Sequence, residues 1–290
     1  MKLALKIKRQ AINAYAKFGT LPYICGIRSV NSLYLPDFLG IGPPKTGTTW
    51  LCENLRCHPD VYISKEKEVH YFNRDFHLSL RFYSDKFKAG ANKIKGEITP
   101  EYYKLSLARI RFIHTIMPHV KLILLLRNPI EQAWSHAVMN LSLSANRELE
   151  SIDELEFYKH YEASSIFARG GYVGIIENWW SVFPPEQLYI GLYEDIKNQP
   201  KKLLKEVFDH IGVSSDVDWS VFPYSNVIIP PVGYKYRNYD RTRGVKVNGY
   251  INTKHSMPAK HEDFLKEMYR HDIESLQIIL KRDFSNWLCS

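Results

Sequence analysis

The stretch Phe38–Cys57, FLGIGPPKTGTTWLCENLRC, carries the residue types best suited to binding an anion. The apolar run 38–41 predicts a buried strand, and Thr46–Cys57 predicts a helix opened by small hydroxyl residues. The first N–H groups of a helix have no intrahelical partner, and the helix dipole puts partial positive charge there. With Lys45 and three threonine hydroxyls added, the loop is predicted to hold a phosphate or a group shaped like one.

The spacing within this loop argues against an ordinary ATPase or GTPase. A Walker A loop needs a lysine directly after its second glycine. Gly42 and Gly47 have the right separation, but Thr48 stands where that lysine belongs, and Lys45 comes two residues before Gly47. The alternative is a turn that only connects a strand to a helix, but lysine, glycine and three threonines exceed what a turn needs.

A second group of chemically active side chains follows the next predicted strand, 60–64. The segment Lys65–Phe72, KEKEVHYF, places Glu68 and His70 directly after this strand. In an open parallel sheet, ligands bind outside the carboxyl ends of the strands. Glu68 and His70 are therefore expected to face the same crevice as the phosphate loop. The alternative is a solvated charged turn with a histidine in the core.

A third group follows the clearest buried strand, Lys121–Leu126, KLILLL. Arg127 comes at its carboxyl end, and Pro129 predicts the start of a helix. Ser135 lies eight residues after Arg127, about two turns along that helix. Arginine and serine together are predicted to clamp one phosphate. The alternative is that Arg127 pairs with a carboxylate at the sheet edge.

These three motifs, in this order and spacing, resemble one enzyme family over roughly residues 38–287. Pro44–Trp50, PKTGTTW, resembles the 5′-phosphosulfate loop of the sulfotransferases that use PAPS (3′-phosphoadenosine 5′-phosphosulfate). Arg127–Ser135 resembles their 3′-phosphate-binding strand and helix. Glu68–Phe72, EVHYF, is similar to the segment that carries the catalytic glutamate in heparan-sulfate-type carbohydrate sulfotransferases. A later pattern, which begins at Gly171, continues through FPPEQL (183–188) and ends at Asp195, also resembles bacterial members of the family.

The resemblance implies an α/β fold, P-loop-like and three-layered, with a central mainly parallel sheet flanked by helices. It implies in-line transfer of a sulfonate from PAPS to an acceptor hydroxyl or amine, with release of PAP (3′-phosphoadenosine 5′-phosphate) and no metal. Glu68 would be the general base, with a pKa raised by partial burial and opposed by Lys45. His70 would orient Glu68 or the acceptor, or itself be the base. Lys45 would also stabilise charge on the bridging oxygen. The residues implied to bind PAPS are Lys45, Thr46, Gly47, Thr48, Thr49, Trp50, Arg127 and Ser135.

Two departures from the family pattern bear on the acceptor and on the 3′-phosphate. Carbohydrate enzymes of this type often carry a lysine inside the Glu-x-Thr-Pro segment, and here Ile98 occupies that place. One cation near the reacting group is therefore missing, which leaves the acceptor open: a glycan, a glycolipid, a lipid alcohol or a small metabolite. The late 3′-phosphate loop is not matched cleanly either. Its candidate residues are Arg243, Gly244, Lys246 and Lys254.

Length and charge set the broad limits. The 290 residues, 45% of them hydrophobic, predict one large domain over 37–290 with a basic helical appendage at 1–36. The net charge of +8 favours an anionic ligand, a polyanion or an acidic membrane surface. The first 18 residues predict either a helix that caps the domain or a peripheral membrane helix. Four cysteines without metal-type spacing and no membrane-length apolar run predict a cytoplasmic protein.

The remaining pattern predicts alternating elements. Further strands are expected at 95–100 and 188–193, and helices at 105–116, 151–167, 172–183, 201–211 and 261–280. The basic, tyrosine-rich stretch 223–250 is interpreted as a mobile loop over the site. Two rival functions are a P-loop small-molecule kinase and a basic protein that binds nucleic acid or a polyanionic glycan through residues 234–246. Both are minor beside the sulfotransferase interpretation. Nucleic acid is not expected as a partner, and the preferred partner is an acceptor alcohol, carbohydrate or lipid-linked.

Overall fold

Five strands form one parallel sheet at the centre of the computed structural model, in the order β2-β3-β1-β4-β5. The structure describes residues 21–23, 26–145, 147–163, 171–222, 236–240, 245–249 and 256–289. The strands are β1 (Phe38–Gly42), β2 (Val61–Ile63), β3 (Ile94–Ile98), β4 (Lys121–Leu126) and β5 (Leu188–Leu192). This parallel sheet confirms the predicted α/β architecture.

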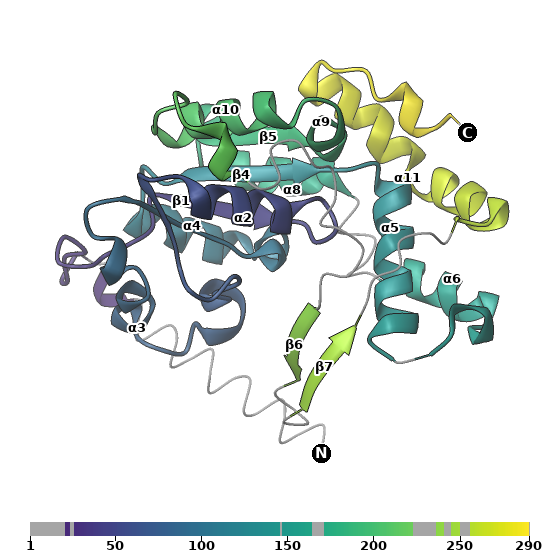
Figure 1. The fold of residues 1–290 in the computed structure, drawn as a ribbon, viewed down its shortest axis with the longest axis horizontal. Helices are drawn as coiled ribbons and strands as arrows, with labels where there is room; N and C mark the ends of the chain where they lie inside the picture. The colour runs from purple at the N-terminus through teal and green to yellow at the C-terminus, as the bar shows by residue number, and fades with distance from the viewer. Residues whose placement is uncertain are drawn as a thin grey trace.

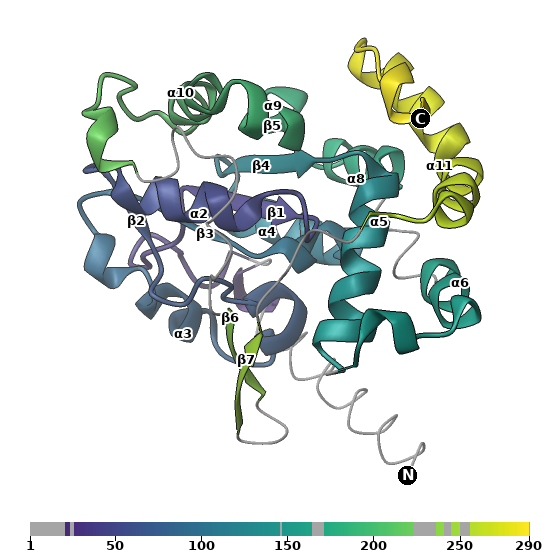
Figure 2. The same cartoon turned by 45° about the vertical axis from the view of Figure 1, so that its right-hand side comes forward.

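Alternate side chains of each strand point into two separate apolar cores. In β4, Leu122, Leu124 and Leu126 join the larger core, whereas Ile123 and Leu125 join the smaller one. Such a continuous apolar run is typical of a strand covered on both faces. Helices α2 and α10 close the smaller core, while α4, α8 and α11 close the larger one (Figures 1 and 2). The result is a three-layer arrangement of helices, sheet and helices.

The helices that cover the sheet have the following bounds. They are α2 (Thr48–Cys57), α3 (Leu80–Asp85), α4 (Leu107–Ile116), α5 (Pro129–Ala137), α6 (Glu154–Glu162), α8 (Tyr172–Trp180), α9 (Tyr193–Asn198), α10 (Pro200–Ile211) and α11 (Ala259–Leu280). Shorter 3₁₀ or π turns are η1 (Tyr71–Asp75), η2 (Lys88–Gly90), η3 (Pro100–Lys104), η4 (Val138–Leu143), η5 (Leu149–Ser151), η6 (Pro185–Gln187), η7 (Trp219–Val221) and η8 (Ser285–Trp287). None of the helices in the described part of the chain is long and apolar enough to cross a membrane.

The strand order brings the predicted site segments to one edge of the sheet. The chain runs from β1 to β2 and β3 on one side, then to β4 and β5 on the other. The order therefore reverses beside β1, and ligands of open parallel sheets bind outside the carboxyl ends at such a point. The loop after β1 and Arg127 after β4 both lie there, because β1 pairs directly with β4.

Two sequence expectations differ from the structure in detail. The helix after β1 begins at Thr48 rather than Thr46, because Lys45 and Gly47 adopt left-handed backbone angles, φ 71° and 91°, that a right-handed helix excludes. Within 223–250, where a mobile loop was expected, the backbone forms two antiparallel strands, β6 (Tyr236–Asp240) and β7 (Val245–Gly249). Tyrosines and valines in these segments favour extended backbone. Residues 223–235, 241–244 and 250–255 lie outside the described part.

The appendage predicted at 1–36 is only partly described. Residues 1–20, 24 and 25 lie outside the described part, so the predicted membrane or capping helix is not tested. Leu33 and Leu35 pack against the larger core. The boundary at residue 37 therefore stays a prediction.

Candidate active site

The loop between β1 and α2 is held in place by a close backbone contact and two side-chain hydrogen bonds. Gly42 has φ 101°, and a Cβ atom there would overlap the carbonyl oxygen of Pro100. Thr46 Oγ1 donates a hydrogen bond to the Pro43 carbonyl oxygen at 2.7 Å. From α5, Gln132 Nε2 donates to the Pro44 carbonyl oxygen at 2.8 Å. Because α2 begins directly after this loop, its unpaired N–H groups and dipole favour an anion.

Cationic side chains gather at this loop. Burial, together with the positive charges of Arg127 and Lys67, lowers the pKa of Lys45 to about 8. Arg127 Nη1 donates to the Lys45 carbonyl oxygen at 3.3 Å. Like charges placed this closely destabilise one another unless an anion lies among them. Their convergence beside a helix N-terminus is the arrangement that an anion-binding site requires.

Arg127 is positioned by the start of α5. The Asn128 side chain accepts from the Ile130 N–H and caps the helix, and Pro129 follows in its first turn. The guanidinium pairs with Glu131 at 2.9 Å and lies 4.5 Å from the ring centroid of Tyr193. Arg127 therefore does pair with a carboxylate, as the alternative interpretation of the sequence expected. An i,i+4 pair with a half-exposed glutamate contributes only about 0.3–0.5 kcal/mol, so a bound anion can displace it.

Glu68 and His70 form the second part of the site. Glu68 Oε2 lies 3.1 Å from His70 Nε2, and Glu68 Oε1 lies 3.5 Å from Lys67 Nζ. The opposite edge of the His70 ring, Nδ1, contacts the Asn73 side-chain amide at 3.3 Å. His70 adopts left-handed angles, φ 57°, just before η1. This backbone turn directs the imidazole back onto the carboxylate two residues earlier.

The predicted direction of the Glu68 pKa shift is wrong. Burial alone raises this pKa, as expected from the sequence. The hydrogen bond from His70 and the positive charge of Lys67 outweigh burial, and the pKa of Glu68 lies below its ordinary value. The carboxylate is therefore ionised at neutral pH, the state in which a base can accept a proton.

Glu97, which the sequence analysis did not single out, supports the segment that carries Glu68 and His70. Its side chain is fully buried and accepts hydrogen bonds from Tyr83 and Thr99 at 2.6 Å and from Tyr102 at 2.9 Å. Burial raises its pKa, while these hydroxyls act against the shift. Thr99 Oγ1 also accepts from the Val69 N–H at 3.1 Å. The Glu97–Thr99 pair thereby fixes the backbone beside Glu68.

We expect Tyr83→Phe to lower the free energy of unfolding by about 2 kcal/mol, because it leaves the buried Glu97 carboxylate with one donor fewer. Denaturant unfolding measures this loss. Tyr158→Phe is the matched control, since Tyr158 donates to Glu154 at 2.7 Å on the surface. An equally small effect at both positions would contradict a structural role for the Glu97 network.

Of the remaining predicted site residues, the structure gives the position of some, and others lie outside the described part of the chain. Ser135 lies on α5, as expected, and is partly exposed. Trp50 is 4% exposed, and its side chain belongs to the smaller core. Lys246 lies in β7, and Arg243, Gly244 and Lys254 lie outside the described residues. In the part of the chain that the structure describes, no three His, Cys, Asp or Glu side chains form a metal-binding group.

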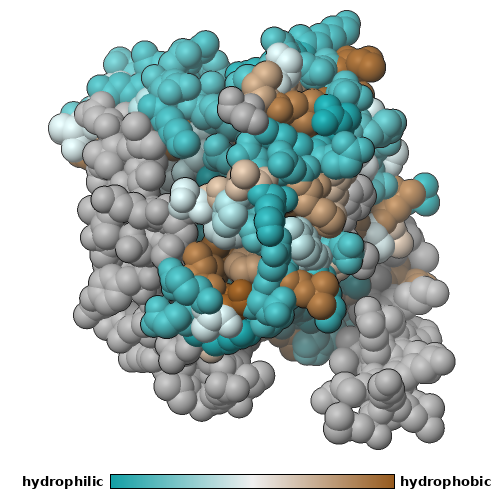
Figure 3. Space-filling view, turned by 90° about the vertical axis from the view of Figure 1, so that its right-hand side faces the viewer, coloured by the Kyte–Doolittle hydropathy of each residue, from teal (hydrophilic) through white to brown (hydrophobic). Residues whose placement is uncertain are grey.

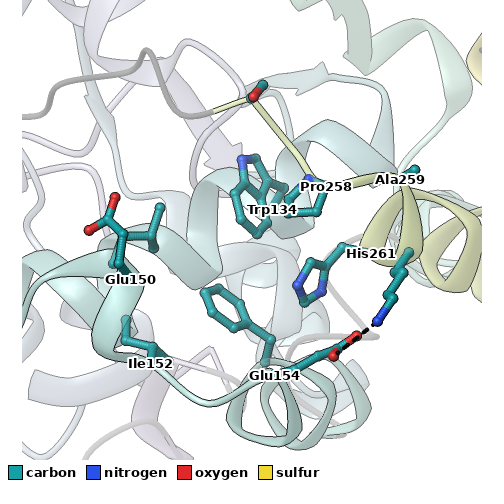
Figure 4. Close-up of a pocket in the computed structure, with 11 residues that line it drawn as sticks. Trp134, Glu150, Ile152, Glu154, Pro258, Ala259 and His261 are labelled. Atoms are coloured by element: carbon teal, nitrogen blue, oxygen red, sulfur yellow. Dashed lines mark ion pairs between the residues drawn. The ribbon is translucent and has the colours of Figure 1, made fainter.

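A cavity of about 640 Å³ lies apart from these residues, between α5, α6 and α11. Trp134, Phe157 and His261 are among the residues that line it, as is Glu154, which pairs with Lys260 (Figure 4). The surface on this side of the molecule mixes apolar and hydrophilic side chains (Figure 3). None of the predicted site residues lines this cavity.

Comparisons with known proteins agree with this geometry. The sequence model of the Sulfotransferase domain family matches residues 35–280, and the chain therefore belongs to that family. The predicted family membership is confirmed.

Among curated relatives, the membrane-associated sulfotransferase kil1 of Dictyostelium discoideum is 24% identical, over 71% of this chain and 62% of the relative. A mouse heparan sulfate glucosamine 3-O-sulfotransferase, 3A1, is 31% identical, over 69% of this chain and 51% of the relative. The chain thus spans less than two thirds of the length of these relatives.

Solved structures support the fold. A sulfotransferase from Alicyclobacillus acidocaldarius has a TM-score of 0.62 at 22% identity, over 87% of this chain and 98% of that one. A mouse sulfotransferase complexed with PAP has a TM-score of 0.50 at 16% identity, over 88% of this chain and 86% of that one.

Proposed function

We propose that this protein is a PAPS-dependent sulfotransferase that moves a sulfonate group to an acceptor hydroxyl. The observation that carries the proposal is the convergence of Lys45, Arg127 and the N-terminus of α2 at one sheet edge, with the ionised Glu68 beside them. Family membership and the PAP bound to a solved relative support PAPS as donor.

In this proposal the two phosphate-bearing ends of the donor lie on different elements. Lys45, Thr46, Gly47, Thr48 and Thr49 bind the 5′-phosphosulfate through the ammonium, hydroxyls and backbone N–H groups. Arg127, directly after β4, and Ser135, on α5, bind the 3′-phosphate. A 3′-phosphate is what distinguishes PAPS from ATP, so this second site sets the choice of nucleotide.

The transfer needs a base and a stabilised leaving group. Glu68 takes the proton of the acceptor hydroxyl as the acceptor oxygen–sulfur bond forms. The bond between sulfur and the bridging oxygen breaks, and its electron pair leaves with PAP. Lys45 offsets the charge that grows on this oxygen. His70 holds the Glu68 carboxylate in position from one side.

The acceptor class follows from the relatives. Heparan sulfate enzymes among them favour a carbohydrate hydroxyl, on a glycan or a glycolipid, as the acceptor of this chain. The buried apolar Ile98 adds no charge beside the site. We propose a carbohydrate or lipid-linked alcohol as acceptor. A peripheral membrane association, as the name of one relative suggests, and a cytoplasmic location stay proposals.

We expect calorimetry to show PAP binding at least tenfold tighter than ADP binding, without Mg²⁺. Arg127→Ala should remove this preference, because it deletes the guanidinium that contacts the 3′-phosphate. Arg270→Ala is the matched control, since Arg270 pairs with Glu267 on the exposed side of α11. Equal affinities for the two nucleotides, or a strict need for Mg²⁺, would contradict the proposed donor.

A further inference from the structure

Lys67 links the two halves of the candidate site. Its ammonium donates to Thr49 Oγ1 at 2.6 Å and lies 3.5 Å from Glu68 Oε1. Thr49 is the second residue of α2, at the end of the helix that faces the anion site. One flexible side chain from the segment after β2 therefore reaches both the phosphate-binding helix and the carboxylate.

The electrostatic surroundings of Lys67 point to an anion. Its positive charge acts on Lys45 strongly enough to contribute to the lowered pKa of that lysine. It also contributes to the lowered pKa of Glu68. The Lys67 side chain exposes 26% of its surface, and its ammonium lies near both a cation and a carboxylate. An anion bound at this position would relieve the repulsion between Lys67 and Lys45.

The neighbouring strand end offers no competing cation. Ile98, the last residue of β3, is fully buried and packs in the smaller core with Trp50. The side chain before it, Glu97, is turned the other way and is bound by hydroxyls. Positive charge on this side of the crevice therefore comes from the Lys67 segment rather than from β3.

We propose that Lys67 is a catalytic residue that binds the transferring sulfonate itself. This inference rests on the proposed function. In the proposed reaction, the sulfonate leaves the 5′-phosphate of PAPS, which is bound at the start of α2. It forms a bond to the acceptor oxygen, whose proton passes to Glu68. The path of the sulfonate therefore runs from the helix end at Thr49 towards Glu68, the two side chains that Lys67 contacts. The ammonium binds the sulfonate oxygens throughout and neither gains nor loses a proton.

The sharpest test compares two ligands that differ by that one group. PAPS carries the sulfonate and PAP does not, so calorimetric dissociation constants for both isolate its contacts. We expect Lys67→Met to weaken PAPS binding about tenfold and PAP binding less than about threefold, because one charge-assisted hydrogen bond to the sulfonate is lost. Lys67→Arg should retain most of the PAPS affinity.

A matched control lies two residues away in the same segment. Lys65 is exposed, and Lys65→Met removes the same charge at the surface, so both affinities should be unchanged. Thermal unfolding of Lys67→Met checks that the segment remains folded. Equal losses for PAPS and PAP would place Lys67 on the phosphate and overturn the inference, as would unchanged PAPS binding. Failure of the wild-type protein to bind either ligand would instead contradict the proposed function, before any variant is compared.

Discussion

Replacing Lys45 by methionine is expected to lower kcat/KM for PAPS by about 10³-fold, at the upper end of the effect of removing one group that stabilises transition-state charge. Lys45 is the cation carried by the loop itself, at a backbone angle, φ 71°, that holds it between β1 and α2. Methionine has a similar length and keeps the packing. The loss therefore reports the charge and not the shape.

The same substitution is expected to make the free protein more stable. Burial and the charges of Arg127 and Lys67 lower the pKa of Lys45 to about 8, well below the 10.5 of an unfolded lysine. The folded state thus releases the Lys45 proton more readily than the unfolded state. Its stability is diminished below pH 8, where Lys45 is charged in both states, and recovers as pH rises from about 8 to 10.5. Lys45→Met removes that unfavourable charge.

A variant that is less active yet more stable separates a binding role from a structural one. Steady-state kinetics and denaturant unfolding at pH 7 measure the two effects, with Lys65→Met as the control for loss of an exposed lysine. PAPS binding should also weaken above pH 8 in the wild-type protein and lose this dependence in Lys45→Met. A stability loss in step with the activity loss would instead make Lys45 a structural residue.

The elements that position the site were largely predictable because their sequence signals are local. The predicted strand Lys121–Leu126 is apolar without a break from Leu122 onward, and the observed strand has the same bounds. The start of α2 was missed by two residues because the left-handed angle of Lys45 comes from the tight loop and not from its own preference. Propensity alone does not register such a constraint.

The environment of Glu68 was harder to predict because it depends on side chains meeting in space. Partial burial was anticipated, but the His70 contact requires the backbone of His70 to turn left-handed, and the Lys67 contact requires its side chain to lie along α2. Glu97 was missed for the same reason. Its three hydroxyl partners come from α3, η3 and the end of β3, which only the fold brings together.

Glu68→Gln is expected to lower kcat by about 10³-fold, within the range for removing a general base, while PAP affinity changes little. Glutamine keeps the size of Glu68 and one of its two oxygen acceptors but has no lone pair basic enough to take the acceptor proton. On the acidic side, the wild-type rate falls when the Glu68 carboxylate is protonated. Because its pKa lies below the ordinary value, this acidic limb is expected below pH 4.5, and the rate is flat near neutrality.

His70→Ala separates the two possible bases. Removing the hydrogen bond from His70 leaves burial less opposed, so the pKa of Glu68 rises and the acidic limb moves to higher pH. If Glu68 is the base, this variant retains substantial activity at high pH, where the carboxylate is fully ionised. If His70 is the base, His70→Ala loses activity at every pH, whereas Glu68→Gln keeps most of it. The pH profiles of kcat for the two variants therefore assign the proton transfer to one side chain, with the other left to orient it.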